Sequence, residues 1–162
     1  MRSVVKAVWL SVAGFISVPV YFAFEALVRI MNLGRLKYLD AGQLVVLKAV
    51  SEVSGCETLA TVELDKVRIA ARATVPIRNT AVALGRDVFI SLDRDELRGS
   101  LLVHELVHVA QREELGRIGM AMEYGRGWVD GFSYRHHHME VAARRVESAA
   151  ASSDVLRVDT TD

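Results

Sequence analysis

The chain has 162 residues, enough for one domain with a substantial hydrophobic core and too few for two comfortable ones. Lysine and arginine number 20, as do aspartate and glutamate, so no net charge attracts nucleic acid and we expect no nucleic-acid partner. Cys56 is the only cysteine, which excludes an internal disulfide and a cysteine-rich metal site. Any metal must therefore be bound by histidine and carboxylate side chains.

The N-terminal segment is the most apolar part of the chain, with no charged residue from Ala7 to Phe24. A helix over residues 7–24 would be about 27 Å long, just enough to cross the hydrocarbon layer of a bilayer. No small-residue cleavage site follows, so the sequence favours a retained membrane anchor with a single N-terminal span over a removed signal peptide. The alternative is a buried or amphipathic helix kinked at Pro19. Basic residues flank both ends, so the positive-inside rule favours neither orientation.

Short elements are expected next. Asp40 and Gln43 have the spacing of a capping box and predict a helix that begins here and ends at Ser54 and Gly55. Apolar and polar side chains alternate over residues 67–72, which is typical of a half-buried strand, and residues 87–91 predict a second strand.

The second half of the chain is predicted to be mainly helical. Acidic residues at 93–96 predict the start of a helix that runs to about Leu115, and a glycine-spaced loop with aromatic side chains is expected over residues 125–134. A last helix is expected from about His137. Residues 148–162 contain few apolar residues and predict a disordered tail. The predicted organisation is a hydrophobic helix over residues 1–35, one domain over 36–147 and the tail.

The predicted helix before Gly116 carries a His-Glu-x-x-His motif formed by His104, Glu105 and His108. Histidines four positions apart lie on the same face of a helix, so both imidazoles can reach one ion. Glu105 projects about 100° away from His104 and is placed to act as general base on a metal-activated water. The motif predicts a Zn2+ site with Glu105 as the catalytic residue. The alternative is a helix with two hydrogen-bonded histidines and a salt-bridged glutamate.

A catalytic zinc site needs a third protein ligand. The metzincin pattern is excluded because Gln111 and Glu114 occupy the positions of its glycine and its third histidine. Glu140 lies near the start of the last predicted helix and is the best candidate, which gives a His-His-Glu set. The histidines at 136–138 are the main rivals. They could supply a metal ligand, a hydrogen-bond donor to the oxyanion, or only a polar start to the helix. Tyr134 is a second candidate for the oxyanion donor.

Residues 101–111, with the downstream Glu140 and Ala143, resemble the short gluzincins whose motif reads H-E-x-x-H-x-x-Q. Many of these are bacterial, and some accompany contractile injection systems. The resemblance covers roughly residues 40 to 147. It implies an α+β, zincin-like minimal metallopeptidase domain, mostly helical, with a small β-sheet or ribbon before the motif helix. It also implies that His104, His108 and Glu140 bind zinc, that Glu105 is the base, and that the strand at 88–90 pairs with an extended substrate.

One position departs from the gluzincin pattern. In better-studied gluzincins an aspartate commonly follows the glutamate ligand by four positions and orients a zinc-bound histidine, whereas this chain has Arg144 there. Support for the histidine must come from elsewhere, and the candidates are Glu147, Asp130 or a backbone carbonyl.

These features predict a zinc-dependent metallopeptidase that hydrolyses a peptide or protein substrate with Glu105 as general base. A second hypothesis is a non-hydrolytic zincin-fold binding or secretion-associated module. A third is a small helical membrane protein in which the motif arises by chance. The sequence leaves the oligomeric state and the substrate specificity open.

Overall fold

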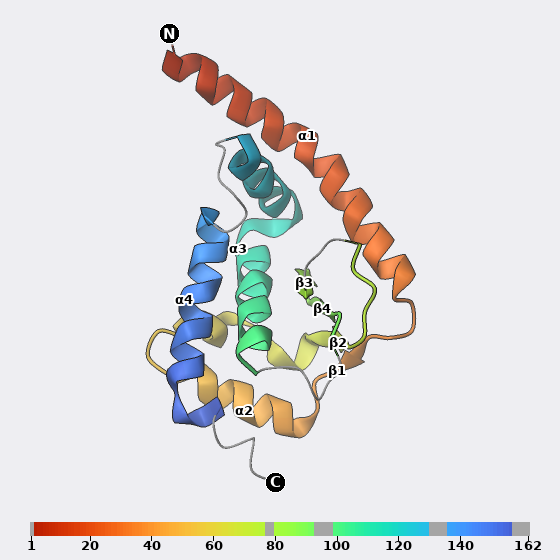
Figure 1. Ribbon diagram of the computed structural model, residues 1–162, viewed down its shortest axis with the longest axis vertical. Coiled ribbons are helices and arrows are strands. Elements are labelled where there is room, and N and C mark those ends of the chain that lie inside the picture. Colours follow the sequence, from red (N-terminus) through yellow and green to blue (C-terminus); the bar gives the residue numbers. More distant parts are fainter. Residues whose placement is uncertain (1, 77–79, 93–98, 130–135, 157–162) are drawn as a thin grey trace.

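The computed structural model describes residues 2–76, 80–92, 99–129 and 136–156, with the backbone alone at 2–11, 128 and 129. Within these residues helices surround a small sheet, so the predicted α+β class with an N-terminal apolar helix is confirmed (Figure 1). The elements in chain order are α1 (Arg2–Met31), β1 (Lys37–Tyr38), α2 (Ala41–Ser51), η1 (Glu57–Thr61), η2 (Leu64–Lys66), β2 (Arg68–Ala70), β3 (Ala81–Leu84), β4 (Asp87–Ile90), α3 (Gly99–Val129), α4 (His138–Ser152) and η5 (Asp154–Leu156).

The capping box predicted at the start of α2 is present. The Asp40 carboxylate accepts a hydrogen bond from the Gln43 backbone N–H (2.9 Å), and the Gln43 side chain accepts one from the Asp40 backbone N–H (3.1 Å). These bonds satisfy donors that the first turn of a helix leaves without intrahelical partners. The helix then buries Leu47 and Val50 against the core.

The sheet has the order β1-β2-β4-β3, in which β4 runs parallel to β2 and antiparallel to β3. The two-residue turn between β3 and β4 begins at Gly85, whose positive φ of 70° favours glycine. The predicted strand at 87–91 is confirmed, and that at 67–72 is shortened to β2. The expectation that residues 88–90 pair with a substrate is wrong, because β2 and β3 occupy both sides of β4. In the described part of the chain the edge strand on this side is β3.

The sheet is covered on both faces. Alternate side chains of β4 point to opposite faces, and accordingly Val88 and Ile90 belong to the main core whereas Phe89 belongs to a second cluster with Val28 of α1. The main core also contains buried side chains of α2, α3 and α4. α1 therefore covers the face of the sheet that the other helices leave, although the predicted domain boundary at residue 35 separates it from the rest of the chain.

α1 is one helix and contains Pro19 without ending there. Residues Val12–Met31 have the length and mean hydropathy (1.5) of a membrane-spanning helix, a test that signal sequences and core helices of soluble proteins also pass. The Ser17 hydroxyl donates to the Ala121 carbonyl oxygen (2.6 Å), so the helix packs directly on α3.

α3 and α4 differ from expectation at their ends. Gly116 has φ 69° and ψ 175°, which interrupts α3 where the sequence predicts the helix to end. Helix resumes after it and runs to Val129, so residues 125–129 are helical and not part of the predicted loop. Residues 93–96 and 130–134 lie outside the described residues. α4 continues through Ser152 with Ala150 buried, and therefore extends into the segment for which disorder was predicted.

Candidate metal centre

The two motif histidines lie on the part of α3 before Gly116, and their side chains meet. The Nε2 atoms of His104 and His108 are 3.3 Å apart. Both residues are buried, as are most of their neighbours on the same helix. The i, i+4 spacing thus has the geometry that the motif predicts.

Glu140 brings a carboxylate to the same point from the first turn of α4. Its Oε2 lies 3.4 Å from His104 Nε2, and its Oε1 lies 3.2 Å from His108 Nε2. Two ligands at about 2.1 Å from a tetrahedral ion are separated by about 3.4 Å. The distances between the three side chains are therefore those of ligands around one metal ion. His104, His108 and Glu140 could hold such an ion.

The charge of this cluster also favours a cation. Glu140 is 1% exposed and Glu105 is 5% exposed. Buried carboxylates are costly unless they are paired with a cation or coordinate a metal. With both imidazoles neutral, two buried carboxylates give a formal charge of about −2, which one divalent ion would balance.

The outer nitrogens of both histidines have hydrogen-bond acceptors. His104 Nδ1 lies 3.0 Å from Glu147 Oε2, and His108 Nδ1 lies 2.8 Å from Gln111 Oε1. Because a carboxylate or amide oxygen can only accept, each Nδ1 carries the proton, and a neutral ring then presents the Nε2 lone pair to the centre. Glu147 thus occupies the supporting role that sequence reasoning offered it as one of several candidates.

Gln111 links the two helices of the site, a role that sequence reasoning missed. While its amide oxygen accepts from His108, its amide nitrogen donates to the Met139 carbonyl oxygen (3.2 Å), next to Glu140. Its position three residues after His108, on the same helix face, is the signal that could have indicated the first contact. The second depends on the packing of α3 against α4.

The base candidate Glu105 lies beside the sheet. Its carboxylate accepts a hydrogen bond from the Ala83 backbone N–H of β3. Burial raises the pKa of Glu105 above its ordinary value, and the neighbouring His108 and His104 oppose this only in part. Burial also lowers the pKa of His104, but the surrounding carboxylates, Glu140 first, outweigh this effect and leave the pKa of that imidazole raised.

The rival histidines do not join the cluster in the described part of the chain. His137 is the N-cap of α4: its Nδ1 accepts from the Met139 backbone N–H, and its Nε2 lies 3.1 Å from the Glu123 carbonyl oxygen. His138 has an exposed side chain, and His136 is exposed. The helix-start interpretation therefore applies to His137. Asp130 and Tyr134 lie outside the described residues.

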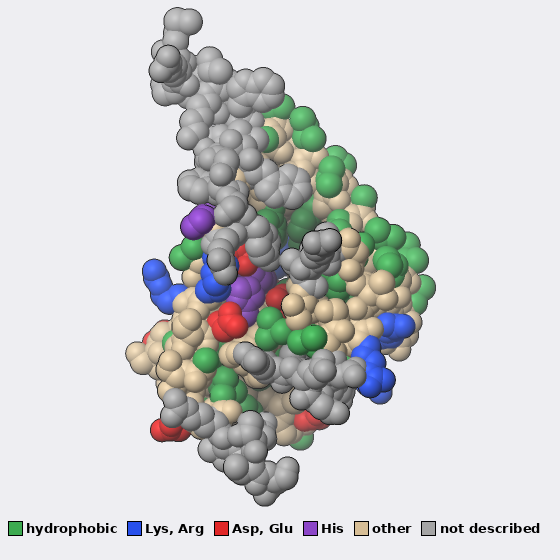
Figure 2. All heavy atoms as spheres, viewed as in Figure 1, with side chains coloured by type: hydrophobic (Ala, Val, Ile, Leu, Met, Phe, Trp, Pro, Cys, Tyr) green, Lys and Arg blue, Asp and Glu red, His purple; other side chains and the backbone are tan. Residues whose placement is uncertain are grey.

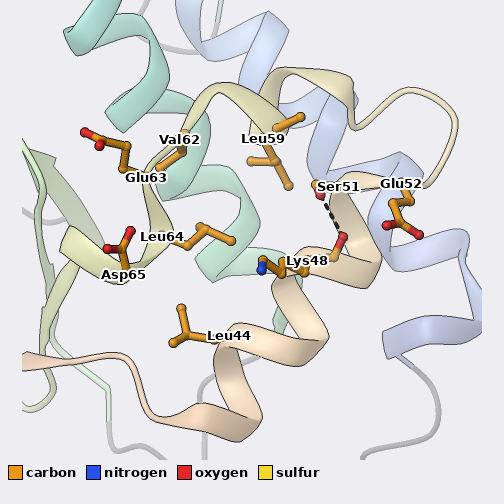
Figure 3. A pocket seen from close by; sticks show the side chains of 10 residues that line it. Leu44, Lys48, Ser51, Glu52, Leu59, Val62, Glu63, Leu64 and Asp65 are labelled. Atoms are coloured by element: carbon orange, nitrogen blue, oxygen red, sulfur yellow. Dashed lines mark hydrogen bonds between the residues drawn. The ribbon is translucent and has the colours of Figure 1, made fainter.

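The candidate metal centre is separate from a groove elsewhere in the described part of the chain. In Figure 2, histidine side chains are visible in a recess near the middle of one face, with acidic side chains beside them. A groove of about 540 Å3 lies instead between α2 and the η1–η2 segment, where Leu44, Leu59 and Leu64 form an apolar floor near Lys48 and Glu63 (Figure 3). None of the side chains of His104, His108 and Glu140 lines it.

A protein-family model described as the eCIS core domain matches residues 49–116. The match covers less than half of the chain and links it to contractile injection systems. The matched segment includes His104, Glu105 and His108, and it ends before Glu140. No curated protein and no solved structure matches the chain.

Proposed function

We propose that the chain is a zinc-dependent metallopeptidase with a zincin-like fold that works in association with a contractile injection system. The observation that supports this proposal best is the triangle formed by the Nε2 atoms of His104 and His108 and the Glu140 carboxylate. The carboxylate oxygens lie 3.2–3.4 Å from the two nitrogens. Two imidazoles and one carboxylate are the ligand set of many catalytic zinc sites, which leave a fourth position open.

Each residue has a distinct role in this proposal. His104 and His108 bind through Nε2 while Glu147 and Gln111 fix their ring orientation, and Glu140 provides the third ligand and negative charge. When bound, a zinc ion would polarise the substrate carbonyl and make a water molecule acidic enough to react near neutral pH.

Glu105 then performs the proton transfers. Its carboxylate takes a proton from the attacking water as the oxygen bonds to the carbonyl carbon, and it passes that proton to the leaving amine nitrogen as the peptide bond breaks. The Ala83 N–H that holds Glu105 belongs to the edge strand β3. An extended substrate that pairs with this edge would lie beside the base.

A non-hydrolytic role is the second candidate, and the eCIS core match favours it. Here the same three side chains bind zinc to hold α3 and α4 together, and the chain serves as a binding or delivery component of the injection system. Both candidates require the metal, so metal content comes first and cleavage decides between them.

The test starts with zinc content after dialysis. We expect one zinc ion per wild-type chain and loss of the metal in His104→Ala and Glu140→Ala. Glu114→Ala, which removes an exposed carboxylate from the same helix as the histidines, is the matched control and should keep its zinc. A wild-type chain without zinc at any concentration of added metal would refute both candidates.

The second step is cleavage of an unbiased peptide library by the zinc-loaded chain. If the chain is a peptidase, Glu105→Gln should retain zinc and lose cleavage by a factor of at least about 10². Equal cleavage by the wild type and by Glu105→Gln would contradict the mechanism. A zinc-loaded wild-type chain that cleaves nothing would establish the second candidate instead.

We also propose that α1 attaches the chain to a membrane, a role that its length and hydropathy support.

A further inference from the structure

The side of α1 that faces away from the rest of the molecule is apolar throughout its described length. Exposed positions recur every three or four residues between Val12 and Met31, which is the spacing of one helix face, and no charged residue interrupts them. The large members of this outer face are Val12, Phe15, Ile16, Val20, Leu27, Ile30 and Met31. Figure 2 shows hydrophobic side chains along the edge of the molecule where Figure 1 places α1.

The opposite side of α1 and the residue after it carry polar groups, and three of these have partners in the rest of the protein. The buried Glu25 carboxylate accepts from Arg117 of α3 (2.9 Å). Arg29 forms an ion pair with Asp87 of β4, and the Asn32 side chain donates to the Thr74 carbonyl oxygen (2.9 Å). The helix thus turns its charged groups toward the protein, beside the buried Val28, and presents an uncharged apolar side outward, whereas a helix on the surface of a soluble domain usually turns polar residues outward.

These contacts are incompatible with α1 crossing a bilayer while the fold is intact. They extend from Gly14, which packs near Met122, to Asn32, and so cover nearly all of the candidate span. A helix that crossed the membrane would carry the charged side chains packed on it into hydrocarbon, which is expensive. The uncharged residues before Gly14, 7–13, add only about 10 Å, roughly a third of the hydrocarbon thickness.

We infer that α1 lies in the plane of the membrane interface, with its outer face in the lipid. The rest of the described chain, which carries the candidate metal centre, then lies on the same side of the membrane as both ends of the helix. This inference deepens the proposed attachment through α1 and does not depend on metal binding. The chain is then a monotopic protein, attached to one leaflet without a span.

Basic side chains beside the outer face point to an anionic lipid surface as its partner. The Arg117 guanidinium is paired with Glu25, lies 3.8 Å from the centre of the Phe22 ring of α1, and belongs to a side chain that is 45% exposed. Arg35 and Lys37 follow the end of the helix on exposed positions, whereas the partly exposed Arg29 is paired with Asp87 and Glu25. Such side chains bury their stems along an apolar surface and place their charges at the headgroups.

The first test measures binding of the full-length chain to vesicles of phosphatidylcholine containing a minority of phosphatidylglycerol. The double variant Phe15→Asp, Val20→Asp should bind at least about tenfold more weakly, because two large side chains no longer enter the lipid. The matched control is Val45→Asp, Val141→Asp, which changes two exposed valines outside α1 and should bind within about twofold of wild type. Equal losses in both variants would overturn the inference.

The second test asks whether the chain crosses the bilayer. Ser3→Cys and Ser148→Cys, each in a Cys56→Ala background, are labelled with a membrane-impermeant maleimide after the chain is added to sealed vesicles. Both cysteines should react from outside to the same extent as in detergent. Protection of either one until detergent is added would show a span and refute the in-plane helix.

The alternative partner for the outer face is a second copy of the chain. Light scattering without lipid should therefore give a monomer for wild type and for the Phe15, Val20 double variant. A wild-type dimer that this variant dissociates would overturn the lipid assignment. Zinc content measured on the same samples should be unchanged, so a failed membrane test is distinguishable from a failed metal site.

Discussion

Removal of the Gln111 side chain should weaken metal binding without removing a ligand. In Gln111→Ala, the His108 Nδ1–H and the Met139 carbonyl oxygen both lose an amide partner. Loss of such an outer partner typically costs 10–100-fold in metal affinity, which corresponds to about 1.4–2.8 kcal/mol. Leaving a buried donor without an acceptor costs about 1–3 kcal/mol. The two estimates agree, so we expect zinc affinity to fall by about 10–100-fold.

The assay is a competition titration of zinc against a chromophoric chelator, with helix content monitored by circular dichroism. Gln111→Glu keeps an acceptor for His108 but loses the donor to Met139, and its affinity should lie between those of Gln111→Ala and wild type. Glu114→Ala, exposed on the same helix, is the control and should match wild type. A Gln111→Ala chain that is folded and binds zinc within about twofold of wild type would refute the argument that this side chain holds His108 in its binding tautomer.

Two further predictions concern packing. Gly125→Ala places a Cβ that would overlap the Ser17 hydroxyl and approach the Ala13 carbonyl oxygen to 2.8 Å, so denaturant unfolding should show a loss of about 1–3 kcal/mol. Gly42→Ala on the exposed start of α2 meets nothing closer than 3.4 Å and should be neutral or slightly stabilising; equal losses in both variants would contradict the close approach of α1 and α3. Burial raises the pKa of the Cys56 thiol, which therefore holds less of the reactive thiolate near neutral pH. A thiol reagent should modify Cys56 only on unfolding, and rapid modification of the native chain would show that its place in the core is wrong.

Much of the candidate site could be predicted from short-range sequence patterns. The His-Glu-x-x-His spacing depends only on helix geometry, which is why His104 and His108 converge as expected. The capping box of α2 is equally local, since Asp40 and Gln43 are three residues apart. Glu140 could be named as a ligand because a carboxylate was needed and the last predicted helix offered one.

What the sequence did not indicate depends on contacts between distant segments. β3 is a strand because it pairs with β4 across a tight turn and lies against the motif helix, and its own residues, Ala81–Leu84, carry no alternation. The end of the helix after Gly116 was missed because Gly125 and Gly127 suggested a loop, whereas Gly125 permits close packing on α1. The polar side of α1 could be recognised only once Arg117 and Asp87 were seen beside it.

Because β4 is buried on both faces, we expect the chain to lose stability when it is shortened from either end. A recombinant fragment limited to residues 49–116, the segment matched by the eCIS core model, would lack Val28, which shares a hydrophobic cluster with Phe89. It would also lack Glu140, whose carboxylate lies next to His104 and His108. The segment that the family model matches is therefore shorter than the unit whose helices cover both faces of β4. Insertions between that segment and α1 or α4 should be tolerated as long as both helices can still pack against it.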